Sequence, residues 1–127
     1  MPDNQQKVLI VEDDRFLAEL LIASLRKANF ETIFAPDAEE AHKELDKQSL
    51  PDIILLDIIL PGMNGFEFLE IIKKEDKLKS IPVIVLSNLG SDQDKKKGME
   101  LGAVAYMVKA NILPEDLIRK IKEVAPK

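Results

Sequence analysis

The sequence contains no cysteine and no tryptophan, and aromatic residues make up only 5% of its 127 residues. Without cysteine there can be no disulfides, no thiolate metal ligands and no thiol nucleophile. The few aromatic rings exclude a broad base-stacking surface, and the excess of acidic residues, 23 against 18 basic ones, argues against binding to a phosphate backbone. We therefore expect an acidic domain with an aliphatic core that does not bind nucleic acid directly.

Long apolar runs are also missing. The longest, from Ile53 to Leu60, is interrupted by Asp57, whereas a membrane span needs about 20 apolar residues. The polar N-terminal tail, residues 1–6, lacks the apolar core of a signal peptide. We therefore expect a soluble, cytoplasmic protein that does not insert into membranes.

What the chain does have is a regular alternation of short aliphatic runs and longer amphipathic stretches. Five runs are typical of buried strands: 8–11, 32–34, 53–56, 83–86 and 104–108. Five stretches are typical of helices, beginning at Arg15, Asp37, Asn64, Ser91 and Pro114. Five strand–helix units without linker or repeat predict one domain, 1–127, of the α/β class with a doubly wound parallel sheet. Gly98 lies inside the fourth predicted helix, where it weakens the helix by about 1 kcal/mol relative to Ala.

In such sheets, ligands bind at the carboxyl ends of the strands. The residues that follow the first, third, fourth and fifth runs are all polar or charged: Glu12, Asp13 and Asp14, then Asp57, Ser87 and Lys109. In the strand order 2-1-3-4-5 of flavodoxin-like sheets, the acids of the first and third strands become neighbours. Carboxylates at one point repel each other unless a cation lies between them, and an oxygen-only ligand set selects Mg²⁺, with Mn²⁺ as a substitute. Together with a hydroxyl and an ammonium group, they indicate phosphoryl transfer through an aspartyl phosphate.

Taken singly, most of these residues have a simpler structural explanation. Asp14 is best explained as a helix N-cap, Ser87 as a turn residue and Lys109 as a surface charge. Asp57 is harder to explain in this way, because a charge inside an aliphatic run is costly without a partner. His42 is expected to be a surface or partly buried residue without a functional role. The functional interpretation therefore depends on the whole set of residues.

Four stretches resemble the receiver domain of two-component response regulators: KVLIVEDD at 7–14, PDIILLDIILPGMNGFEF at 51–68, IPVIVLSN at 81–88 and GAVAYMVK at 102–109. They occur in the family's order and spacing and cover essentially the whole chain. The resemblance implies a phosphorylation-dependent signalling switch that accepts a phosphoryl group from a histidine kinase or a histidine phosphotransfer protein. It also implies a protein that catalyses only its own phosphorylation and dephosphorylation.

The resemblance further assigns roles to individual residues. Asp57 is the implied phosphoacceptor, Ser87 the hydroxyl that moves to the phosphoryl group, Lys109 the ion-pairing lysine and Tyr106 the aromatic residue whose orientation follows phosphorylation. The implied Mg²⁺ ligands are Asp13, Asp57, the backbone carbonyl of Ile59, and Glu12 either directly or through water. The turn after the phosphorylation site is matched by Pro61, Gly62 and Gly65.

Two positions depart from the family pattern. Asn88 follows Ser87, where Ala or Gly is usual, and Ala110 follows Lys109, where proline after a cis peptide is usual. A cis bond before a residue other than proline costs about 2.5–4 kcal/mol. We therefore predict a trans bond, with a loop rerouted through Asn111 that is able to displace Lys109 from its usual approach.

Other functions remain open at this point. A small-molecule phosphatase or phosphotransferase of the haloacid-dehalogenase type needs a second acid two residues after the nucleophile, where this chain has Ile59, and no Gly-rich phosphate loop is present. An interaction module that has lost phosphorylation usually lacks one of the acidic, hydroxyl or lysine residues, and all are present here. We expect a stand-alone receiver with a separate effector on the face of the fourth helix, fifth strand and fifth helix. A piece cut from a longer regulator would have the same sequence.

Overall fold

The fold of this protein is a single parallel sheet covered by helices on both faces. The computed structural model describes residues 5–47 and 49–126. Its strands are β1 (Lys7–Val11), β2 (Glu31–Ala35), β3 (Ile53–Leu56), β4 (Val83–Ser87) and β5 (Ala105–Val108). They are all parallel, in the order β2-β1-β3-β4-β5. The predicted fold class and strand order are therefore confirmed.

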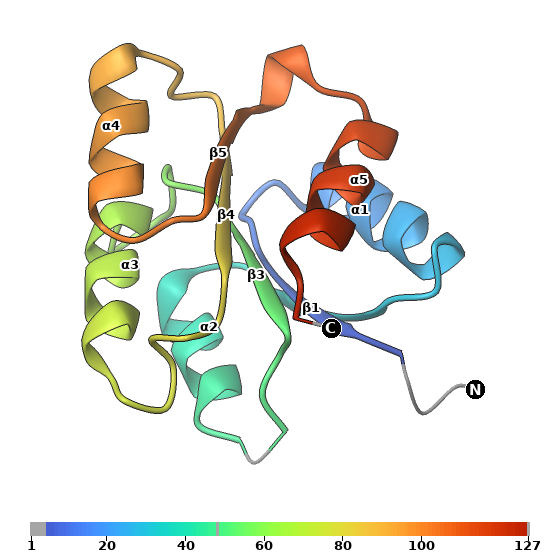
Figure 1. Cartoon of the computed structure of the whole chain (residues 1–127), viewed down its shortest axis with the longest axis horizontal. Helices are drawn as coiled ribbons and strands as arrows, with labels where there is room; N and C mark the ends of the chain where they lie inside the picture. The colour runs from blue at the N-terminus through green and yellow to red at the C-terminus, as the bar shows by residue number, and fades with distance from the viewer. Residues whose placement is uncertain (1–4, 48, 127) are drawn as a thin grey trace.

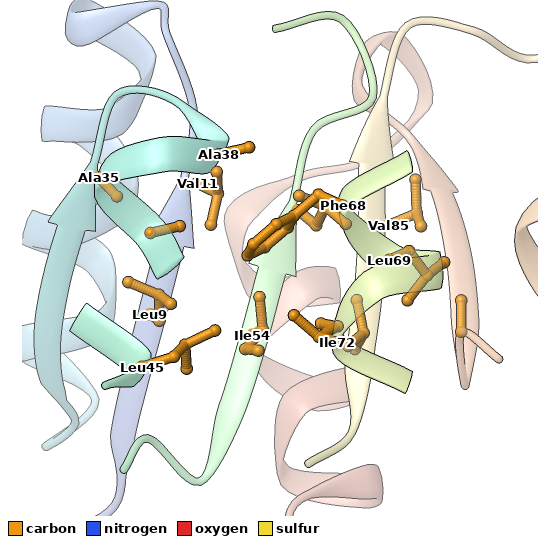
Figure 2. Close-up of a cluster of buried hydrophobic side chains, with 14 of the residues drawn as sticks. Leu9, Val11, Ala35, Ala38, Leu45, Ile54, Phe68, Leu69, Ile72 and Val85 are labelled. Carbon is orange, nitrogen blue, oxygen red and sulfur yellow. The ribbon is translucent and has the colours of Figure 1, made fainter. Parts of the chain in front are cut away.

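Within residues 5–47 and 49–126, five α-helices cover the two faces of the sheet, as Figure 1 shows for their arrangement. On one face lie α1 (Arg15–Lys27) and α5 (Pro114–Val124), and on the other α2 (Ala38–Leu45), α3 (Gly65–Lys74) and α4 (Asp92–Glu100). Successive side chains of a strand point to opposite faces, so each central strand contributes to two separate cores. The core beneath α2 and α3 contains Leu9, Ile54 and Val85 (Figure 2). Their strand neighbours enter the core beneath α1 and α5.

Side-chain caps explain where four of the helices begin. Each cap accepts a hydrogen bond from a backbone N–H that has no partner within the helix. The four acceptors are Asp14 for α1, Asp37 for α2, Asn64 for α3 and Ser91 for α4. At α3 the bond is reciprocal, because the Glu67 carboxylate accepts from the Asn64 N–H. These are the residues at which the sequence predicted helix starts, and Asp14 has the capping contact expected of it.

Some features differ from the sequence-based expectation. β4 extends through Ser87, which is its last residue rather than the first residue of the following turn. A 3₁₀ helix, η2 (Lys109–Asn111), follows β5 at a position for which the hydrophobic pattern predicted no helix. All peptide bonds within 5–47 and 49–126 are trans, which confirms the predicted geometry between Lys109 and Ala110.

Other expectations concern the surface and the ends of the chain. His42 is partly buried, as expected, and its Nε2 lies 2.9 Å from Glu75 Oε2, which links α2 to the end of α3. Most of the predicted tail 1–6 lies outside the described residues, but the Gln6 side-chain amide donates a hydrogen bond to the Pro126 carbonyl. None of the described helices has the length and apolar character that crossing a membrane requires.

Candidate functional site

The strand order places the carboxyl ends of β1 and β3 side by side in the middle of the sheet. Val11 pairs with Leu56, so Glu12 and Asp57 follow neighbouring strands at the same level. Strand-like bonds continue one residue further, because the Asp57 N–H donates to the Val11 carbonyl at 3.0 Å and the Glu12 N–H to the Ala35 carbonyl at 3.0 Å. Both acids are thus held on rigid backbone rather than on a free loop.

Three carboxylates meet at this edge of the sheet. One oxygen from each of Glu12, Asp13 and Asp57 lies within 4.8 Å of the others. Glu12 and Asp57 are only 2% and 4% exposed, whereas Asp13 is exposed to solvent. Oxygen donors at this separation are the kind that Mg²⁺ and Mn²⁺ prefer, and an exposed third acid leaves a path for a hydrated ion. The residues present therefore fit a divalent cation.

Lys109 reaches into the same cluster from the end of β5. Its Nζ lies 2.7 Å from Asp57 Oδ2 and 2.7 Å from Glu12 Oε1. Burial acts to lower the pKa of Lys109, but the hydrogen bonds and charges of Asp57 and Glu12 outweigh it and raise this pKa above its usual value. The expectation that a trans bond would displace Lys109 is therefore wrong, because its long flexible side chain reaches both acids from η2.

The surroundings of Glu12 shift the pKa of its carboxyl group. Burial raises the pKa of its carboxyl group, and the nearby negative charge of Asp57 raises it further. Hydrogen bonds from Lys109 and from the Asp14 N–H, the latter at 3.0 Å, partly offset these effects. The net effect is that the pKa of Glu12 lies above its ordinary value.

Two further side chains of the predicted set converge on Leu89. Ser87 is fully buried, and its Oγ accepts a hydrogen bond from the Leu89 N–H at 3.3 Å. The Tyr106 hydroxyl donates to the Leu89 carbonyl at 2.5 Å. Burial, together with the negative charges of Asp94 and Asp57, raises the pKa of Tyr106 to about 12. Leu89 thus connects the two residues, a contact that no pattern in the sequence indicated.

The turn after β3 positions the remaining atoms of the site. The Ile59 N–H donates to Asp57 Oδ1 at 3.2 Å, and the Ile59 side chain is 53% exposed. A Cβ on Gly65 would lie 2.3 Å from the Asp57 carbonyl oxygen, so only glycine lets α3 begin this close to the site. Gly62 has a φ of +75°, a conformation that favours glycine. The Pro-Gly-x-x-Gly spacing was the sequence signal for this geometry.

An α/β domain with an acidic cluster, a buried hydroxyl and a lysine at the carboxyl edge of its sheet has the architecture of a receiver. The chain belongs to the response regulator receiver domain family, whose model matches residues 8–122. It is therefore a receiver domain of two-component signalling, a class of signalling switches. Proteins of this family interact with histidine kinases and effectors.

The comparisons with individual proteins agree with this assignment. The phosphate regulon transcriptional regulatory protein PhoB of Escherichia coli (strain K12) is 34% identical over 119 residues, which cover 94% of this chain and 51% of PhoB. The chain thus spans about half the length of the curated relatives it matches. A putative response regulator from Chloroflexus aurantiacus has a TM-score of 0.88 and 32% identity, covering 94% of this chain and 97% of that one. For the chemotaxis protein CheY4 of Vibrio cholerae the TM-score is 0.86 and the identity 30%, covering 94% and 98%.

Proposed function

We propose that this receiver domain accepts a phosphoryl group on Asp57, from a histidine kinase or a histidine phosphotransfer protein, in a Mg²⁺-dependent reaction. The observation that carries the proposal is the position of Lys109 Nζ, 2.7 Å from both the Asp57 and the Glu12 carboxylates. A buried nucleophilic carboxylate beside a fixed ammonium group, at an edge open to solvent through Asp13, is suited to receive a phosphoryl group.

In the proposed reaction an Asp57 carboxylate oxygen forms a bond to phosphorus while the bond from phosphorus to the donor's imidazole nitrogen breaks. The Lys109 ammonium group, which lies beside Asp57, stays close enough to form an ion pair with the negatively charged phosphoryl group. The Ser87 hydroxyl, which accepts from the Leu89 N–H beforehand, turns to donate to a phosphoryl oxygen. The domain thereby catalyses only its own phosphorylation and its own dephosphorylation, in which water attacks phosphorus, the bond to Asp57 breaks and inorganic phosphate leaves.

Glu12, Asp13, Asp57 and the Ile59 carbonyl are the proposed ligands of the metal ion, with Glu12 acting directly or through water. When bound there, Mg²⁺ neutralises negative charge on the oxygens of the transferred group. The carboxylate cluster supports this choice. So does the Mn²⁺-bound form of response regulator Rcp1, which is 28% identical, with a TM-score of 0.82 over 96% of this chain and 99% of that one.

The proposed effector surface consists of α4, β5 and α5. Met99 on α4 and Val104 just before β5 are 47% and 43% exposed, and Tyr106 connects this region to the site through Leu89. A partner can therefore make apolar contacts with a surface whose structure depends on the phosphorylation state of Asp57. This surface would serve equally for a separate effector protein, as the sequence led us to expect, and for one carried on the same chain.

The test is incubation with Mg²⁺ and a small phosphodonor, followed by intact-mass measurement. We expect wild type to gain the mass of one phosphoryl group, and Asp57→Asn and metal-free wild type to gain none. Asp76→Asn makes the same chemical change at an exposed residue just after α3. It serves as the matched control and should react like wild type. A gain that persists in Asp57→Asn contradicts the assignment of the phosphoacceptor.

A further inference from the structure

A groove runs between α2 and α3, which cover neighbouring parts of the same core (Figure 2). Its volume is about 820 Å³, within the range of roughly 300–1,000 Å³ that is typical of binding pockets. The buried side chains of Ala38 and Phe68 form its floor, and the loop 61–63 lines it on the side where α3 begins. None of its lining residues belongs to the proposed phosphorylation site, so the groove has no role assigned so far.

Two large apolar side chains lie at the rim of this groove. Met63, in the loop before α3, is 40% exposed, and Ile71, in the second turn of α3, is 38% exposed. An α-helix rises about 1.5 Å per residue, so α3 extends roughly 9 Å from Gly65 to Ile71. Residues i and i+7 of a second helix are about 10 Å apart. The apolar part of the groove therefore has the length of two turns of a partner helix.

The polar side chains that line the groove leave it with negative charge. Asp37 and Glu39 form no ion pair with any cation among residues 5–47 and 49–126. The two basic lining residues already have acidic partners, because Lys43 Nζ lies 3.1 Å from Glu40 and His42 contacts the carboxylate at the end of α3. The pKa of Lys43 is raised by its hydrogen bond with Glu40 and by the negative charges of Glu40 and the two unpaired acids. A ligand of this groove should therefore be apolar and carry positive charge.

We propose that the groove is a docking site for an amphipathic helix of a partner protein, with apolar side chains at i, i+4 and i+7 and basic side chains beside them. The apolar side chains contact Met63, Phe68 and Ile71, and the basic ones pair with Asp37 and Glu39. Recognition of a helix in an apolar groove is a common mode of binding, and complementary charges at the rim select the partner. This docking site is separate from the proposed effector surface of α4, β5 and α5.

Synthetic helical peptides of about 15 residues test the chemistry of the partner. The first peptide has Leu at i, i+4 and i+7 with Arg beside them, the second has Glu in place of Arg, and the third has Gln in place of Leu. We expect the first to shift the amide resonances of α2, α3 and residues 61–63 to saturation, and the other two to bind at least about tenfold more weakly. Absence of a saturable shift with the first peptide, or equal affinity for either of the others, would overturn the proposal.

Charge reversal in the protein separates docking in the groove from general attraction to an acidic domain. Glu39→Lys should weaken binding of the first peptide by about tenfold or more. Glu19→Lys makes the same change at an exposed position of α1, on the other face of the sheet, and should bind the peptide like wild type. If the two variants bind it equally, the groove is not the docking site.

The apolar rim is tested in the same assay. Met63→Gln and Ile71→Gln should each weaken binding of the first peptide by about threefold or more, whereas Leu20→Gln, at an exposed position of α1, should not. Thermal midpoints close to that of wild type verify that these variants fold. Self-association of the peptide-free domain that Ile71→Gln abolishes would assign the groove to a second copy and overturn the partner helix. All of these measurements use unphosphorylated protein, so their outcome is independent of the proposed function.

Discussion

Asp13 and Asp14 are neighbours in sequence whose carboxylates do different things. Asp14 caps α1 by accepting from the Leu17 N–H at 3.1 Å, whereas Asp13 belongs to the acidic cluster with Glu12 and Asp57. Replacing Asp14 by Ala should lower the free energy of unfolding by about 1 kcal/mol and leave phosphorylation in place. Replacing Asp13 by Ala should abolish Mg²⁺-dependent phosphorylation while leaving stability unchanged or higher, because repulsion between like charges is relieved.

Denaturant unfolding and intact-mass measurement on the two variants check this pair of expectations. Each variant is the control for the other, since both lose one negative charge at adjacent positions. Phosphorylation of Asp13→Ala at the wild-type rate would show that Asp13 is not a metal ligand.

From the resemblance to receivers we expect the side chains of Ile59 and Leu89 to line the path by which water reaches the proposed phosphorylation site. The Ile59 side chain is 53% exposed beside Asp57, and Leu89 is held at its N–H by Ser87 and at its carbonyl by Tyr106. Hydrolysis of an aspartyl phosphate needs a water in line with the bond that breaks, and bulky apolar side chains neither orient nor admit one. We therefore expect a comparatively long-lived phosphoprotein.

Ile59→Asn and Leu89→Glu should each accelerate the loss of phosphate, measured by the decay of phosphoprotein after removal of the donor. Ile71→Asn, which changes an exposed residue of α3, should decay like wild type and is the control. If neither substitution near the site speeds the decay, apolar shielding does not set the lifetime.

Tyr106 and Lys109 make the stability of the domain sensitive to alkaline pH. The pKa of Tyr106 is raised by burial and by the charges of Asp94 and Asp57 to about 12. Between the ordinary tyrosine pKa of 10.0 and this value, the folded state keeps a proton that the unfolded state loses. The free energy of unfolding should therefore fall as pH rises through this interval. The raised pKa of Lys109 acts with the same sign, because its stabilising contribution is lost above the ordinary lysine value of 10.5.

Denaturant unfolding at a series of alkaline pH values measures how steeply the free energy of unfolding falls with pH. Tyr106→Phe should show a shallower decline than wild type, because the variant has no phenolic proton to retain. An identical slope in the two proteins would mean that Tyr106 is not shielded in the folded state.

At the scale of elements, α4 differs from the other helices in how little of it is buried. Gly98 is its one buried residue, whereas α3 buries five of its ten. Weakly packed elements open most easily and are suited to change with the state of a switch. We expect the amides of α4 to exchange with solvent faster than those of α3, and phosphorylation to alter exchange in α4 and β5. Hydrogen exchange followed by mass spectrometry checks this, with α2 as an internal reference that should not change.

The same elements indicate what the sequence can and cannot predict. Periodicity and capping residues such as Asp37 and Asn64 are local signals, so the helices, the strands and the acids at the strand ends were all predictable. The contacts of Leu89 and the burial of Gly98 were not, because they depend on how α4, β4 and β5 pack together. For the same reason η2 was missed, and the reach of Lys109 to the acids from a trans backbone was underestimated.

At the scale of the whole molecule, three of the exposed large apolar residues belong to α1 and to the residue just before α5. Phe16 in the first turn of α1 is 74% exposed, Leu20 one turn later 51%, and Leu113 just before α5 59%. These residues belong to the face of the sheet that α1 and α5 cover (Figure 1). Both helices begin near the carboxyl ends of the strands, which is also where Asp57 lies. A protein that delivers a phosphoryl group must cover this edge, so we expect it to bury Phe16 and Leu20.

Burying such a side chain contributes roughly 1.5–3 kcal/mol. Phe16→Ala and Leu20→Ala should each slow transfer from a histidine-phosphorylated donor protein about tenfold or more, and leave the reaction with a small phosphodonor unchanged. Ile71→Ala, which removes an exposed apolar side chain from the opposite face, is the control. Equal loss with both kinds of donor would indicate damage to the site rather than to docking.

The contact between Gln6 and Pro126 has a practical consequence for engineering this domain. Their hydrogen bond joins the segment before β1 to the segment after α5, on the side of the sheet where the strands begin. The acidic cluster lies at the opposite edge, where the strands end. A short linker between these two segments should therefore close the polypeptide into a ring, or permit circular permutation with new termini in an exposed loop, without disturbing the metal ligands. Dyes or affinity tags attached to either segment should likewise leave the approach to Asp57 open.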